Sequence, residues 1–116
     1  MEQQTKNIVL ALDATTLGRG DDALGSQLMV NFLRTLAFRD DVPQTVVCYN
    51  AGVKLALRDS PALPMLEALA QKGSDIVLCG TSVNFFQIAD LLAVGRVGDM
   101  QGIVDALARA DKVIYV

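Results

Sequence analysis

Short apolar runs alternate along the chain with longer amphipathic stretches. Nearly continuous apolar runs predict strands covered on both faces, whereas apolar residues three or four positions apart predict helices. The predicted strands are residues 7–13, 45–49, 75–78, 93–97 and 112–116. The predicted helical segments are 21–38, 53–57, 60–72 and a last helix that starts at 99, with an irregular or helical segment at 82–92. This alternation predicts a three-layer α/β/α sandwich around a mostly parallel five-stranded sheet.

The helices are expected to pack one apolar face on the sheet. In the first helix the predicted face is formed by Leu24, Leu28, Phe32 and Leu36. In the last helix it is formed by Ile103, Val104, Leu107 and Ala108. Ser60 is the predicted N-cap of the middle helix because proline follows it, and Gly73 is its predicted left-handed end.

Composition favours a single folded domain over residues 1–116. Apolar residues make up 52% of the chain and charged residues 20%, which excludes a disordered protein. The apolar share is high for 116 residues, whose surface is large relative to their volume. We therefore expect part of the apolar surface to lie in an interface between subunits.

Charge and residue types exclude several function classes. The net charge is −3 and the 10 Lys and Arg form no basic stripe, so we expect no nucleic-acid partner. The absence of His removes His-dependent catalysis and most zinc sites, and we expect no metal or cofactor. Residues 1–6 lack the order of a signal peptide, and no apolar run reaches membrane-spanning length. These features predict a cytoplasmic protein without a membrane partner.

Polar or reactive residues follow three of the predicted strands: Asp13, Asn50 and Cys79. Ligand sites of open parallel sheets lie beyond the carboxyl ends of the strands, so we expect the chemistry at this edge. Cys79 is the candidate nucleophile, because the Gly-Thr-Ser sequence after it permits a sharp turn into a helix whose N–H groups favour a thiolate. The alternative is that Cys79 packs as a small apolar residue.

The remaining polar candidates each have a structural alternative. Cys48 lies inside an apolar run, where packing is expected, and we expect no disulfide. Lys54 is expected near the same sheet edge, where it would lower a thiol pKa or hold an anion, or else it is a solvated surface lysine. Asp13 either caps the next loop or points into the cleft.

Two further segments are ambiguous. Arg19 lies in a glycine-containing loop without the spacing of a phosphate-binding loop, and it is either solvated or contacts a partner. A nucleotide or phosphate binder therefore rests on fold analogy alone. Phe85 and Phe86 wall a pocket beside Cys79, form a subunit contact, or fill the core.

Several segments in order resemble the DsrE/DsrF-like family of small sulfur-relay proteins. They are residues 17–21, 24–25, 49–55, 59–60, 79–81, 94–95, 99–100 and 110–113, and they span almost the whole chain. Within the family they are most similar to the DsrE-like domain of YedF, a sulfurtransferase-like protein associated with selenium metabolism. The resemblance implies one DsrE-like domain that assembles into homotrimers or homohexamers.

The resemblance also implies a role for the thiol. Cys79 would accept sulfur as a persulfide and pass it to a sulfur-carrier protein of the TusA/SirA type. Gly80 and Thr81 would offer backbone N–H groups to the anionic sulfur, and Asn50 and Lys54 would frame the cleft. Ser82 and Asp13 would be further binding residues. The alternative is a non-catalytic homo-oligomeric binding module of the same fold. It is favoured by Ser82, which stands where the family often has a second cysteine.

Overall fold

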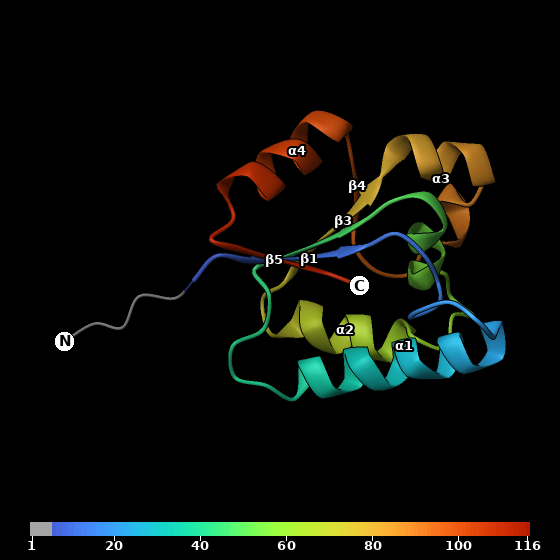
Figure 1. Ribbon diagram of the computed structural model, residues 1–116. Coiled ribbons are helices and arrows are strands. Elements are labelled where there is room, and N and C mark those ends of the chain that lie inside the picture. The colour runs from blue at the N-terminus through green and yellow to red at the C-terminus, as the bar shows by residue number, and fades with distance from the viewer. Residues whose placement is uncertain (1–5) are drawn as a thin grey trace.

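The computed structural model describes residues 6–116 as a sheet between two layers of helices (Figure 1). The expectation that the chain lacks a signal peptide rests almost entirely on residues 1–5, which lie outside the described residues. The elements are β1 (Ile8–Leu12), α1 (Asp22–Ala37), β2 (Thr45–Cys48), the 3-10 helix η1 (Asn50–Ala56), α2 (Leu63–Gln71), β3 (Asp75–Cys79), α3 (Gly80–Phe86), the 3-10 helix η2 (Ala89–Leu91), β4 (Arg96–Gly98), α4 (Met100–Arg109) and β5 (Lys112–Tyr115).

The sheet has the strand order β4-β3-β2-β1-β5, and every neighbouring pair is parallel. The three inner strands are almost wholly buried, as their continuous apolar runs predict. The edge strands β4 and β5 are short and mostly exposed. The predicted fold class is confirmed, and the sheet is wholly rather than mostly parallel.

Helices α1 and α2 cover one face of the sheet and α4 covers the other (Figure 1). Successive residues of a strand point to opposite faces. Val77 lines the space beneath α4, so Leu78 and its register partner Cys48 face α1 and α2. Met29 and Leu33 of α1 and Leu66 and Leu69 of α2 are fully buried beneath that face. No helix within residues 6–116 is long and apolar enough to cross a bilayer.

The predicted buried face of α1 is wrong in its first two turns. Leu24 and Leu28 are exposed, and Gly25, Met29 and Leu33 face the core instead. Gly25 explains why this face is buried, because a Cβ at position 25 would lie only 2.7 Å from Cβ of Thr16. The helix therefore approaches the preceding loop through its glycine and leaves a second apolar stripe in solvent.

The last helix is also rotated from the prediction. Ile103 is buried and Leu107 half-buried, but Val104 and Ala108 are exposed. Asp99 caps α4 as expected, its Oδ1 accepting a 2.8 Å hydrogen bond from the N–H of Gly102.

Two element boundaries differ from the prediction. Helix α2 begins at Leu63 rather than after Ser60, whose Oγ instead accepts a hydrogen bond from the N–H of Ala62 in a turn. Strand β4 occupies 96–98 rather than 93–97. The chain just before it pairs antiparallel elsewhere, with the N–H of Ala93 donating to the carbonyl of Ala56.

Candidate functional site

The carboxyl edge of the sheet carries Asp13, Asn50 and Cys79 at the ends of β1, β2 and β3. Gly52 allows this arrangement, because a Cβ at that position would overlap the carbonyl oxygen of Leu12. The 3-10 helix η1 therefore packs directly on the end of β1. This close approach brings Asn50 to the first strand as well as to the third.

Cys79 is the last residue of β3 and the residue before α3. Its side chain is only 3% exposed, so it is not an open surface thiol. Burial raises the pKa of the Cys79 thiol, but hydrogen bonds from Ser82 and Thr81 lower it by more. The resulting pKa lies below the ordinary cysteine value, which favours the thiolate.

Ser82 connects Cys79 with Asn50. Its Oγ accepts a 2.8 Å hydrogen bond from the backbone N–H of Asn50, which leaves its own proton for the sulfur of Cys79. Asn50 has a left-handed backbone with φ of 52°, a conformation that asparagine tolerates. Ser82 was predicted as a binding residue, but the sequence contains no signal for its contact with Asn50.

Cys48 is in a different environment. It faces the α1 and α2 layer, whereas Cys79 follows Leu78 and points to the other side of the sheet. Complete burial without a polar partner raises the pKa of the Cys48 thiol to about 12. Both cysteines are free thiols, as expected.

A cavity of about 250 Å³ lies beside the start of α3. Thr81 and Ser82 form one wall, and Phe85 and Phe86 form another, with Asn50 at the rim. The aromatic rings stack edge to face with centroids 5.2 Å apart, and Phe85 is 79% exposed. Phe85 is therefore not core filling, which was one of its alternatives.

Lys54 lies against the aromatic wall of this cavity. Its Nζ is 4.2 Å from the centroid of the Phe86 ring, a cation–π contact. Lys54 also lines a separate cavity of about 210 Å³ with Thr15 and Asp59. The lowered pKa of Cys79 comes from hydrogen bonds and not from this ammonium.

Asp13 and Arg19 line a second cavity at the same sheet edge, with a volume of about 460 Å³. Asn50 and Tyr115 are among its other lining residues. The hydroxyls of Tyr115 and Tyr49 hydrogen-bond to each other across the carboxyl edge. Burial, the neighbouring phenol and the charge of Asp13 raise the pKa of Tyr49. The sequence held no signal for the tyrosine pair.

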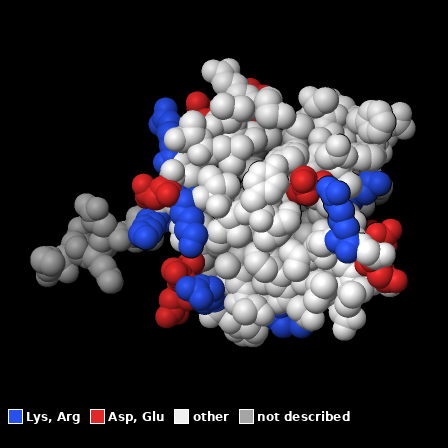
Figure 2. All heavy atoms as spheres, in the orientation of Figure 1, with Lys and Arg blue, Asp and Glu red and all other residues white. Residues whose placement is uncertain are grey.

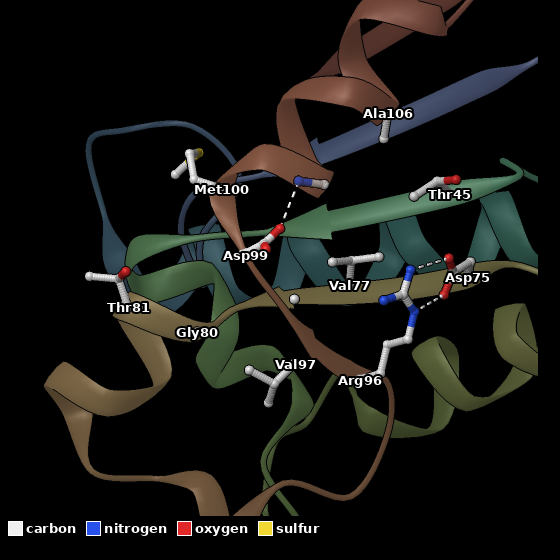
Figure 3. Close-up of a pocket in the computed structure, with 12 residues that line it drawn as sticks. Thr45, Asp75, Val77, Gly80, Thr81, Arg96, Val97, Asp99, Met100 and Ala106 are labelled. Carbon is white, nitrogen blue, oxygen red and sulfur yellow. Dashed lines mark hydrogen bonds and ion pairs between the residues drawn. The ribbon is translucent and has the colours of Figure 1, made fainter.

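A larger cavity of about 580 Å³ runs between the sheet and α4 (Figure 3). Gly80 and Thr81 lie at its carboxyl end, and Val77 is on its floor. At the opposite end Asp75 accepts two 2.9 Å hydrogen bonds from the guanidinium of Arg96. This ion pair holds β4 to β3 and lowers the pKa of Asp75. Within residues 6–116, no group of three or more Cys, Asp and Glu side chains is placed to hold a metal ion.

A sequence model described as the DsrE/DsrF-like family matches residues 6–116. No curated protein matches the chain. Among solved structures, the YchN protein of E. coli superposes with a TM-score of 0.73 at 17% identity, covering 96% of this chain and 99% of that one. MTH1491 of Methanobacterium thermoautotrophicum, a protein of unknown function, gives 0.67 at 23% identity, covering 94% and 97%. At these identities the two structures establish the shared fold.

Proposed function

Because the chain belongs to the DsrE/DsrF-like family, we propose that it is a small sulfur-transfer protein that carries a persulfide on Cys79. The observation that carries the proposal is the contrast between the two thiols. Hydrogen bonds from Ser82 and Thr81 bring the pKa of Cys79 below its ordinary value, whereas burial raises that of Cys48 to about 12. Sulfur transfer requires a thiolate, and Cys79 is the thiol whose surroundings favour one.

In the proposed step the Cys79 thiolate attacks the terminal sulfur of a donor persulfide, R–S–SH. A new S–S bond forms to Cys79, the S–S bond of the donor breaks, and its electron pair leaves on R–S⁻. The product is Cys79–S–SH, and the step needs no external oxidant or reductant. The hydroxyls and N–H groups of Thr81 and Ser82 stabilise the thiolate of Cys79 before it attacks.

Burial sets a condition on this chemistry. Cys79 is 3% exposed, so a donor reaches the sulfur only when the residues that cover it move aside. We propose that the first turn of α3 makes this movement, because its residues Thr81 and Ser82 already line open cavities. A sulfur carrier of the TusA/SirA type as the acceptor, a homotrimer or homohexamer as the assembly, and the link to selenium metabolism all stay predictions.

Intact-protein mass spectrometry after incubation with inorganic polysulfide tests the proposal. The wild type and Cys48→Ser are expected to gain about one sulfur atom, and Cys79→Ser is expected to gain none. Cys48→Ser is the matched control, since it removes the other thiol. An equal gain in Cys79→Ser, or no gain in the wild type, would contradict the proposal.

The second candidate is a non-catalytic homo-oligomeric binding module. It is favoured by the burial of Cys79 and by the exposed apolar side chains of Leu24, Leu28 and Phe85. For such a module, Cys79→Ser leaves both assembly and partner binding unchanged, and no sulfur is gained from polysulfide.

A further inference from the structure

The cavity at the ends of β1 and β5 has a charge pattern that the sulfur chemistry does not use. Asp13 and Arg19 both line it, and within residues 6–116 neither side chain takes part in an ion pair or hydrogen bond. Elsewhere in the described chain, Arg39 pairs with Asp41 and Arg96 with Asp75. The cavity thus presents one free carboxylate and one free guanidinium to the same space.

A ligand that satisfies both groups carries an ammonium and a carboxylate close together. A free α-amino acid has this pair on one carbon, and its volume is well below the 460 Å³ of the cavity. A carboxylate binds a guanidinium in a bidentate manner, which makes Arg19 a strong anchor. A nucleotide or inorganic phosphate fits less well, because Asp13 repels its negative charge.

Asn50 relates this cavity to the surroundings of Cys79. Asn50 lines both this cavity and the one formed by Thr81 and Ser82. Neighbouring strands are about 4.8 Å apart, so the ends of β1 and β3 are separated by about 10 Å. A ligand side chain that leaves Asp13 and Arg19 past Asn50 would run toward the end of β3.

We propose that this cavity binds a small sulfur-bearing α-amino acid, with Asp13 holding its ammonium and Arg19 its carboxylate. The ligand class is a free amino acid with a sulfur at the end of a short side chain, such as the persulfide of cysteine. Binding is independent of the sulfur-transfer proposal. The role of the ligand as sulfur donor rests on that proposal.

The binding test uses S-methyl-L-cysteine, in which a methyl group replaces the terminal SH of cysteine persulfide. Backbone amide NMR shifts are expected to change around residues 13–19 and at Tyr115. Asp13→Asn and Arg19→Gln are each expected to weaken binding by at least about tenfold. Asp105→Asn and Arg109→Gln, which alter exposed charges on α4, serve as matched controls and are expected to bind normally.

Two analogues assign the contacts. The analogue without the ammonium is expected to bind the wild type more weakly than S-methyl-L-cysteine does. Because Asp13 has no cation to hold in this analogue, Asp13→Asn is expected to bind it at least as tightly as the wild type does. The molecule without its carboxylate is expected to be insensitive to Arg19→Gln. Equal binding of the amino acid to all variants, or shifts outside this cavity, would overturn the inference.

The experiments distinguish a failure of the amino-acid site from a failure of the sulfur-transfer function. If S-methyl-L-cysteine binds as described but polysulfide adds no sulfur to Cys79, the amino-acid site stands and the sulfur-transfer function fails. If Cys79 takes sulfur from polysulfide while S-methyl-L-cysteine does not bind, the inferred site is wrong and the sulfur-transfer function stands.

Discussion

Ser82 makes two contacts that together set the state of the neighbouring thiol. Its oxygen accepts the N–H of Asn50, and its proton is thereby directed to the sulfur of Cys79. A hydroxyl that both accepts and donates holds the thiolate more firmly than a freely rotating one. The residue therefore favours an anionic sulfur at Cys79.

Replacing Ser82 by Ala removes that hydrogen bond and is expected to raise the pKa of Cys79. The rate of alkylation at neutral pH follows the thiolate fraction, so Cys79 should react about two- to tenfold more slowly. The rate should also reach its plateau at higher pH than in the wild type. Iodoacetamide labelling followed by peptide mass spectrometry across a pH series measures both effects.

Three comparisons make this test specific. Ser82→Thr keeps a hydroxyl and is expected to retain most of the rate. Ser60→Ala removes a hydroxyl that accepts a backbone N–H in a remote turn, and it should leave Cys79 unchanged. Cys48, whose pKa is about 12, should stay slow below pH 8 in every variant. A Ser82→Ala protein with wild-type labelling kinetics would show that the hydroxyl does not set the thiol pKa.

Helices and strands were predictable from the sequence where a single local pattern specifies them. Continuous apolar runs gave the inner strands, and Asp21 marked the start of α1, where it caps the N–H of Leu24 at 2.8 Å. The buried face of α1 was not predictable, because the helix has two apolar stripes and only the close contact of Gly25 with the preceding loop distinguishes them. The same limit applies to the site. Asn50 meets Ser82 across 32 residues only because η1 packs on β1.

The packing of η1 on β1 depends on Gly52. In Gly52→Ala the new Cβ would overlap the carbonyl oxygen of Leu12, so η1 must move away from β1. We expect the free energy of unfolding to fall by about 2–3 kcal/mol, measured by urea denaturation. The displacement of Asn50 should also weaken its contact with Ser82 and slow the labelling of Cys79.

Gly102→Ala provides the control for a glycine replacement. Gly102 lies within α4, where a new Cβ would lie 3.2 Å from the capping Oδ1 of Asp99, a contact that a small shift of this side chain relieves, and alanine favours a helix. This variant should keep the stability and the Cys79 reactivity of the wild type. Equal unfolding midpoints for Gly52→Ala and the wild type would mean that the approach of η1 to β1 is not tight.

At the scale of the whole molecule, apolar side chains remain exposed on several elements. Leu24 and Leu28 lie on α1, Val113 and Tyr115 on β5, and Val104 on α4. Figure 2 shows a broad uncharged surface between α4 and α1, with most charged side chains at its margins. Strand β5 is also an edge strand with one unpaired side. A high apolar share and an open strand edge are both features of subunits that associate.

We therefore predict that the protein is a homo-oligomer held partly by the outward stripe of α1. Leu28→Glu places a charge in that stripe without touching the core, since Met29 and Leu33 carry the inward face. Light scattering after gel filtration should show the wild type at a multiple of 12.4 kDa and Leu28→Glu shifted toward the monomer. Gln71→Glu, a change at another exposed position on α2, should keep the wild-type mass. A wild type that runs as a monomer at micromolar concentration would show that these apolar side chains serve another partner. A Leu28→Glu protein of unchanged mass would instead place the interface away from α1, with β5 as the next strand edge to block.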